Sequence, residues 1–185
     1  MLADTDSKAE LRDFTYPYLF QSASESIIME SITYCLPGRI FCRTNHILLA
    51  VDGSEGSAKA ATVAFEIAEM TKSKLYIVHV VPTPSVNQLS LMTDMNADEV
   101  LTKYLEHGRS LLAGYQNASK EFHIETELVL DQGHPAERVI STGQQNDVDL
   151  IVIGTRGTSG SRRAGMGSFT ERIVLMAECP VLVAK

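Results

Sequence analysis

Short apolar runs recur along this chain, and segments with the spacing of a helix separate them. Four runs are continuous, at 46–51, 74–81, 149–153 and 181–184, and a fifth segment, from about Phe122 to Leu130, has alternating apolar residues. A continuous apolar run of this length is typical of a strand covered on both faces. Strands that alternate with helices form right-handed βαβ units and a parallel sheet. We therefore predict an α/β fold, a three-layer, doubly wound sheet of five mainly parallel strands with helices on both faces.

Capping residues mark where the intervening helices begin. Ser54 is a suitable N-cap, and so is Asn96, which has Glu99 three residues later. Pro135 suits the first turn of a helix, where its missing N–H costs no hydrogen bond. The four residues from Ser168 have the form of a capping box ahead of the last helix.

Two segments between these elements are predicted to be irregular. Proline, serine, asparagine and aspartate recur without a period from Pro82 to Met95, which predicts a long loop. Asp131-Gln132-Gly133 has the residue types of a turn and is expected to end the third strand.

The stretch from Gly154 to Thr170 follows a predicted strand and precedes a predicted helix. Glycines let the main chain approach an anion closely, and a helix N-terminus offers unpaired N–H groups at the positive end of its dipole. Arg156, Arg162 and Arg163 add positive charge. This order of strand, glycine-rich loop and helix predicts a phosphate-binding cradle. The glycines alone would also suit a mobile loop, and the arginines could be solvated surface charges.

Three segments are expected to meet at one edge of the sheet. In doubly wound sheets, ligands bind at the carboxyl ends of the strands, where the strand order reverses. Asp52 follows the first strand, Val80 lies near the end of the second, and the glycine loop follows the fourth. Asp52 could instead be only a turn former, and Val80 fits a core position on pattern alone. His79 lies in an apolar strand without a Cys or Glu partner, which predicts a packed histidine rather than a ligand or base.

The spacing within the glycine loop is more specific than its composition. Gly154 and Gly157 are separated by two residues, Gly157 and Gly167 by nine, and Ser168 follows at once. This resembles the G-x2-G-x9-G-[S/T] nucleotide-binding signature of the universal stress protein family, and the resemblance extends over 46–185. It implies an adenine nucleotide alpha hydrolase-like form of the doubly wound fold. Family members with the complete signature bind ATP, so ATP with Mg²⁺ is the implied ligand.

The resemblance also implies which residues contact the nucleotide. Asp52 would meet the ribose or a phosphate-bound Mg²⁺, and the main chain of Val80 would meet adenine. Ser168 would face the phosphates, although it could be only an N-cap. The implied partner is a second copy of the chain, paired through Val181–Ala184. The full set implied for cofactor binding is Ala50, Asp52, Val80, Gly154, Arg156, Gly157, Gly167, Ser168, Phe169 and Thr170.

Composition limits the classes of function. The 185 residues suffice for one domain, and 44% hydrophobic with 21% charged residues is typical of a soluble globular protein. A net charge of −7 argues against a dominant nucleic-acid function. No apolar run approaches the ~20 residues of a membrane span. The three cysteines lack metal-ligand spacing, and the first residues are acidic where a signal peptide would be positive, so we expect a cytoplasmic protein.

Residues 1–45 lack the alternation of apolar runs and helical segments seen in the rest of the chain. They are predicted to be an N-terminal extension of a domain at 46–185. They mix aromatic and charged residues, with a short helix expected within 24–34. A partner-binding arm, a targeting segment, an appended tail, or upstream sequence ahead of a true start at Met29 would each fit. No residues in the segment have a spacing typical of a catalytic or binding motif, which favours the last two alternatives.

Three functions fit these observations. The first is a homodimeric regulatory module that binds ATP with Mg²⁺ and reports nucleotide state or stress to a partner. The second is an ATP-cleaving enzyme, but the S-G-G-x-D-S loop and H-x-G-H pair of related enzymes are absent from the sequence. Phosphoryl transfer also needs a positioned base or nucleophile, and only Asp52 is a candidate. The third is a structural dimer that holds no nucleotide.

Overall fold

The computed structural model describes residues 44–93, 96–157 and 165–185. The predictions made for residues 1–43, and those for Arg162 and Arg163, lie outside the described residues. Within the described ranges, no helix combines the length and the apolar character that a membrane crossing requires.

Five strands form one sheet in which every neighbouring pair is parallel. The order across the sheet is β3-β2-β1-β4-β5. The chain builds outward from β1 to β3 on one side and then returns to add β4 and β5 on the other, so the strand order reverses between β1 and β4. This confirms the predicted doubly wound sheet. The strands are β1 (His46–Ala50), β2 (Lys74–Pro82), β3 (Thr126–Gly133), β4 (Leu150–Gly154) and β5 (Val181–Ala184).

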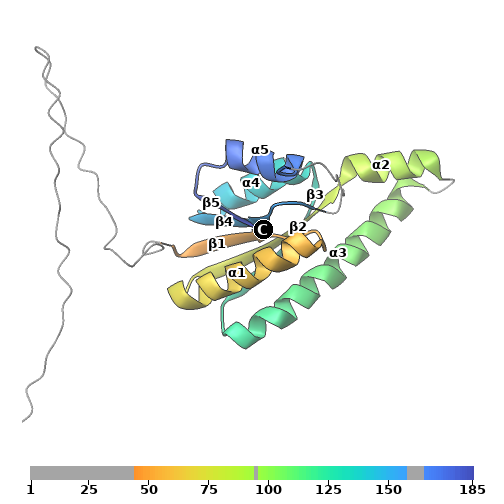
Figure 1. Cartoon of the computed structure of the whole chain (residues 1–185). Helices are drawn as coiled ribbons and strands as arrows, with labels where there is room; N and C mark the ends of the chain where they lie inside the picture. The colour runs from red at the N-terminus through yellow and green to blue at the C-terminus, as the bar shows by residue number, and fades with distance from the viewer. Residues whose placement is uncertain (1–43, 94–95, 158–164) are drawn as a thin grey trace, which may run out of the picture. The chain divides into compact units, whose positions relative to one another are not determined.

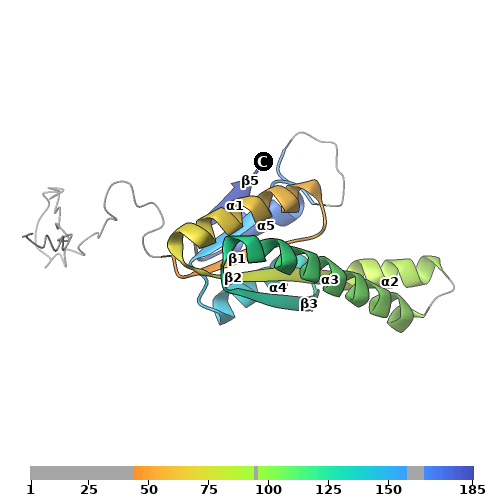
Figure 2. The same cartoon turned by 90° about the horizontal axis from the view of Figure 1, so that it is seen from below.

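Helices cover both faces of this sheet, as predicted. α1 (Glu55–Thr71) and α3 (Ala97–Ser119) lie on one face, and α4 (Pro135–Gln145) and α5 (Ser168–Met176) lie on the other (Figure 1). α2 (Thr83–Met92) follows β2 directly, packs against α3, and extends beyond the sheet (Figure 2).

The core sits on both sides of the central strands. Leu48 and Val78 pack with Val139 of α4 and Ile173 of α5 in one buried cluster. Successive side chains of a strand point to opposite faces of the sheet. The neighbours of Leu48 on β1 and of Val78 on β2 therefore point to the other face, toward α1 and α3. A fully buried aliphatic side chain of this kind contributes about 1.5–3 kcal/mol. The alternate residues Ile47, Leu49, Leu75 and Ile77 are 0% exposed.

The predicted helix starts are largely confirmed. The Ser54 hydroxyl accepts a hydrogen bond from the Ser57 N–H at 3.1 Å, and the Asn96 side chain accepts from the Asp98 N–H at 3.1 Å. Pro135 lies in the first turn of α4, as predicted.

The predicted loop between Pro82 and Met95 is wrong, because α2 occupies most of it. Pro82 is the N-cap residue and Pro84 lies in the first turn, where a helix tolerates proline. Val86 is the buried residue of this helix. With so little apolar surface turned inward, α2 lacks the periodic pattern by which a helix is predicted.

The third strand is shifted relative to its prediction. Phe122 belongs to a short 3₁₀ helix, η1 (Lys120–Phe122), and its ring centroid lies 5.3 Å from that of Phe65. His123 then adopts a left-handed conformation, and β3 starts at Thr126. At the other end, the predicted turn at 131–133 is strand, because these residues pair with Val80, Val81 and Pro82 of β2.

Candidate functional site

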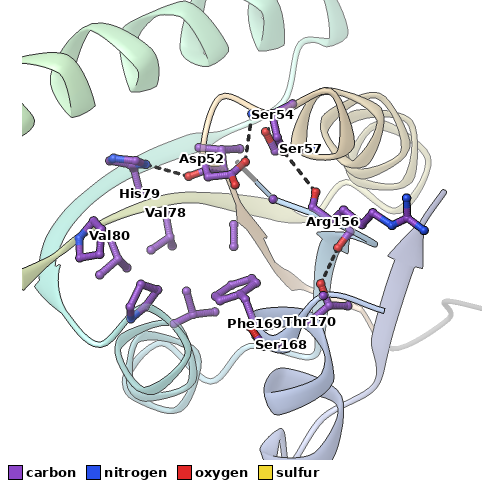
Figure 3. Close-up of a pocket in the computed structure, with 18 of the residues that line it drawn as sticks. Asp52, Ser54, Ser57, Val78, His79, Val80, Arg156, Ser168, Phe169 and Thr170 are labelled. Carbon is purple, nitrogen blue, oxygen red and sulfur yellow. Dashed lines mark hydrogen bonds between the residues drawn. The ribbon is translucent and has the colours of Figure 1, made fainter. Parts of the chain in front are cut away.

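β2 is longer than β1 at its carboxyl end. Ala50, the last residue of β1, pairs with Val78, whereas β2 continues alongside β3 as far as Pro82. After Ala50 the chain turns away into α1. A cavity of about 460 Å³ lies at this carboxyl edge (Figure 3). Its volume is within the range that is usual for small-molecule sites.

All residues predicted to contact a cofactor line this cavity. The predicted convergence of the first strand end, the second strand and the glycine loop is therefore confirmed, while their contact with a ligand stays a prediction. Tyr104 and His107 of α3 also line it and were not predicted, although their spacing of three places them on one helix face. The predicted residues in the cavity wall are Ala50, Asp52, Val80, Gly154, Arg156, Gly157, Gly167, Ser168, Phe169 and Thr170.

The main-chain polar groups of Val80 face the space that β1 leaves. In a parallel ladder, every second residue of a strand directs its N–H and C=O toward the same neighbour. The Val51 N–H donates to the Val78 carbonyl at 2.9 Å, so the polar groups of Val78, and hence of Val80, point toward the β1 side. Among the described residues, the Val80 N–H has no bond to Val51 or to a side chain. Val80 thus presents a donor and an acceptor side by side.

The His79 ring bonds the main chain at the end of β1. Its Nδ1 lies 2.8 Å from the Val51 carbonyl oxygen, and because a carbonyl only accepts, Nδ1 carries the proton. His79 is 8% exposed. α3 passes directly over the ring, since a Cβ on Gly108 would lie 2.8 Å from His79 Cδ2. These contacts confirm the prediction of a packed histidine.

Asp52 lies at the first turn after β1. Its Oδ1 accepts a hydrogen bond from the Ser54 N–H at 3.0 Å, and Gly53 between them has a φ of +80°. Asp52 therefore acts as a turn former, one of its two predicted roles. Gly157 faces the other carboxylate oxygen: a Cβ on Gly157 would collide with Asp52 Oδ2. The glycine gives the carboxylate its room within the cavity wall.

Gly154 packs against the first turn of α1. A Cβ on Gly154 would lie 2.5 Å from the carbonyl carbon of Gly56, and a Cβ on Gly56 would in turn collide with the Arg156 carbonyl oxygen. The Ser54 hydroxyl donates to that same Arg156 carbonyl at 3.3 Å. Glycine at both positions lets the end of β4 touch the main chain of α1 directly.

The start of α5 is fixed to the end of β4. The Gly167 N–H donates to the Thr155 carbonyl at 3.0 Å, and the buried Thr170 hydroxyl donates to the Gly154 carbonyl at 2.8 Å (Figure 3). The predicted capping box is wrong, because the N-cap is Gly167 and Ser168 is the first helical residue. Serine offers a capping side chain, but here the Thr170 hydroxyl and the Gly167 N–H make the anchoring bonds instead.

The first amides of α5 belong to residues that line the cavity, and they have no partner within the helix. The first main-chain bond of the helix runs from the Glu171 N–H to the Gly167 carbonyl at 2.8 Å. The N–H groups of Ser168, Phe169 and Thr170 precede it, and within the described residues none of them has a bonded acceptor. The Gly167 N–H, in contrast, is already bonded to Thr155.

Few charged groups lie at this edge among the residues that the structure describes. The Arg156 Nε donates to the Gly165 carbonyl at 3.3 Å, and the side chain extends away from Val80 and His79 (Figure 3). Asp131, paired with Val80 across the ladder, holds Arg138 of α4 at 2.6 Å. The hydrogen bond to Asp131 raises the pKa of Arg138. In the described part of the chain, no group of three or more His, Cys, Asp or Glu residues could hold a metal by itself.

Residues 43–185 match the sequence model of a known family, described as the universal stress protein family. The chain belongs to the universal stress protein family. The match covers every strand and helix described above, as well as the cavity. The resemblance noted from the glycine spacing is thereby confirmed at the level of the family.

Relatives and solved structures within the universal stress protein family match about three-quarters of the chain. Universal stress protein YxiE of Bacillus subtilis (strain 168) is 30% identical over 146 residues, which are 76% of this chain and 99% of YxiE. The structure of universal stress protein UspA from Lactobacillus plantarum is 25% identical, with a TM-score of 0.68, over 77% of this chain and 99% of that one.

Two further universal stress protein structures were solved with adenine nucleotides. One, from Archaeoglobus fulgidus, is a complex with dAMP, at 21% identity and a TM-score of 0.57 over 78% of this chain and 99% of that one. The other is a complex with cAMP, at 19% identity and a TM-score of 0.56 over 76% and 96% of the two chains. At these identities the likeness shows the shared fold, and the ligands are properties of those two proteins.

Proposed function

We propose that this universal stress protein binds ATP with Mg²⁺ in the cavity at the carboxyl edge of its sheet and acts as a homodimeric, nucleotide-dependent regulatory module. The observation that carries the proposal is the meeting of three distant segments, with every residue implied by the family resemblance, in one cavity. The dAMP and cAMP complexes of two proteins with the same fold support an adenine nucleotide as the ligand class.

The base is assigned to the β2 end of the cavity. Val80 presents its N–H and C=O there, and these groups match the N1 acceptor and N6 donor of adenine. The surrounding wall is apolar, with Ala50, Val78 and Val139 lining it. A flat base buried against aliphatic side chains and held by two main-chain hydrogen bonds gains both apolar burial and orientation.

The phosphates are assigned to the start of α5. The N–H groups of Ser168, Phe169 and Thr170 lie at the positive end of the helix dipole, where anions are stabilised. Gly157 and Arg156 also line the cavity. Asp52 lies between the two ends, at the position assigned to the ribose.

Mg²⁺ fits this arrangement as an ion shared with the phosphates. Magnesium in nucleotide sites is usually held by one or two carboxylates together with phosphate oxygens and water. The Asp52 carboxylate is the one carboxylate among the described residues of the cavity wall, so it would supply the protein ligand. The bound ion would neutralise phosphate charge.

A second copy of the chain is assigned to the free edge of β5. The Ile151 N–H donates to the Pro180 carbonyl and the Thr155 N–H to the Ala184 carbonyl, so the polar groups of Val181 and Val183 face outward from the sheet. Outward-facing strand groups pair readily with another strand. The neighbouring helix α5 adds exposed apolar residues, Val174 at 43%, Leu175 at 77% and Met176 at 48%.

Calorimetry with purified protein tests the proposal. We expect ATP and dAMP to bind, GTP to bind more weakly, and ATP to bind more weakly when EDTA removes Mg²⁺. Mass spectrometry of small molecules released from freshly purified protein should detect an adenine nucleotide. No binding at millimolar ATP, or equal binding of ATP and GTP, would contradict the assignment. Steady multiple-turnover release of ADP that disappears in Asp52→Ala would identify an enzyme instead.

A further inference from the structure

The carbonyl of Val51 is the last acceptor that β1 offers to β2. The hydrogen bonds between the two strands follow the regular parallel pattern as far as Val51, whose N–H donates to the Val78 carbonyl at 2.9 Å. In an uninterrupted parallel ladder, the next bond would run from the Val80 N–H to the Val51 carbonyl. That bond is not made among the described residues; the His79 Nδ1–H occupies the carbonyl at 2.8 Å.

We propose that His79 is a positioning residue that ends the β1–β2 ladder one bond early and so leaves the Val80 N–H available to a ligand. Val51 is 5% exposed, and a buried carbonyl requires a donor. Two donors lie in line with it, the side chain of His79 and the main chain of Val80, and within the described residues only His79 bonds it. Because the ring bonds the Val51 carbonyl, the Val80 N–H stays available to a ligand in the cavity.

The ring is held in the position that this role requires. α3 lies on its outer side, where a Cβ on Gly108 would come within 2.8 Å of His79 Cδ2 and within 2.7 Å of Leu130 Cδ1. The glycine at position 108 therefore lets the helix close over the ring. Figure 3 shows His79 bonded to the turn beside Asp52, next to Val80 on the same strand.

The assignment of the Val80 N–H to a base rests on the proposed nucleotide binding, but the effect of His79 on the ladder does not. Two variants whose new side chains are nearly equal in size distinguish the effect of the hydrogen-bond donor from the effect of the ring's volume. His79→Asn places an amide donor near the position of Nδ1, and His79→Leu removes it. Both leave the same space beneath Gly108.

Hydrogen exchange of the Val80 amide in the ligand-free protein, followed by NMR, is the first measurement. We expect rapid exchange in the wild type and in His79→Asn, and exchange at least about 10-fold slower in His79→Leu, because the Val80 N–H then bonds the Val51 carbonyl. Slow exchange in the wild type, or equal exchange in wild type and His79→Leu, overturns the proposal.

Calorimetry with AMP and with ribose 5-phosphate is the second measurement. We expect His79→Leu to lose about 10-fold in AMP affinity and His79→Asn to stay within about 3-fold, with ribose 5-phosphate affinity equal in all three proteins. Equal loss in both variants would assign His79 to packing and overturn the proposal. If the wild type binds no AMP, nucleotide binding fails, and Val80 exchange still decides the role of His79. Should His79→Leu not fold, His79→Gln replaces it. The amide of glutamine reaches the Nε2 position and leaves no donor at the Nδ1 position, so the results expected for His79→Leu apply to it.

Discussion

Gly157 lies directly against the carboxylate of Asp52, so that any Cβ at position 157 would collide with Oδ2. Gly154, three residues earlier in the same signature, meets main-chain atoms of Gly56 instead. Gly157 thus makes room for the end of a side chain, whereas Gly154 makes room for main-chain atoms, which shift less easily. The two positions should respond differently to the same substitution.

Gly157→Ala should weaken nucleotide binding and leave the fold intact. The methyl group displaces the Asp52 carboxylate, which is the end of a side chain rather than main chain, and position 157 is exposed. We expect ATP affinity to fall about 10-fold or more and the free energy of unfolding to change by less than about 0.5 kcal/mol. Calorimetry and urea denaturation measure the two quantities.

Gly114→Ala is the matched control for this substitution. Nothing lies within 4 Å of a Cβ at Gly114, which belongs to α3. The variant should bind ATP like the wild type and gain about 0.5–1 kcal/mol of stability from its better helix propensity. A Gly157→Ala variant that binds like Gly114→Ala would show that Asp52 does not need its observed position.

Gly154→Ala should lower stability even without ligand. Its methyl group would lie 2.5 Å from the carbonyl carbon of Gly56, so β4 and α1 must move apart. Overpacking of this kind costs about 1–3 kcal/mol. The midpoint of urea unfolding should therefore fall in Gly154→Ala and not in Gly157→Ala. Equal midpoints in the two variants would contradict the packing role of Gly154.

Thr170→Val should loosen the start of α5. The hydroxyl of Thr170, which is 1% exposed, donates to the Gly154 carbonyl at 2.8 Å, and valine has the same shape without the donor. An unsatisfied carbonyl costs about 1–3 kcal/mol. We expect lower stability and a larger loss of affinity for ATP than for adenosine, because the phosphate end moves. Thr170→Ser keeps the hydroxyl and should restore both, and a Thr170→Ser variant as weak as Thr170→Val would refute this account.

Val183→Pro should convert a dimer into monomers. The outward-facing N–H of Val183 disappears, while the bonds from β5 to β4 use the alternate residues. Sedimentation velocity should show the smaller species for Val183→Pro and the dimer for Val183→Thr, which keeps the N–H. A dimer that survives Val183→Pro would place the second copy on a different surface.

The residues that carry the site could be predicted because their chemistry is local. Gly154, Gly157 and Gly167 have a fixed spacing, and Asp52 directly follows an apolar strand. Strand order then places these segments at one edge of the sheet. The role of His79 could be predicted only in part. An apolar strand indicates a packed ring, but the acceptor of its proton, the Val51 carbonyl, lies just beyond the end of β1 and leaves no mark on the sequence.

The errors have a common physical cause, namely that tertiary contacts outweighed local preference. Residues 131–133 have turn chemistry, yet they extend β3 because β2 offers them a pairing partner as far as Pro82. The proline-containing segment after β2 forms α2 because both prolines fall where a helix tolerates them. Ser168 could have capped α5, but the anchoring bonds of Gly167 and Thr170 place it one position inside the helix.

The bond between the Ser54 hydroxyl and the Arg156 carbonyl joins positions 102 residues apart. Such a contact closes a loop over most of the domain, so opening the cavity here separates two segments that are distant in the sequence. A small molecule bound across that junction would therefore raise the kinetic stability of the protein. It would slow the opening step and so lower the rate of proteolysis.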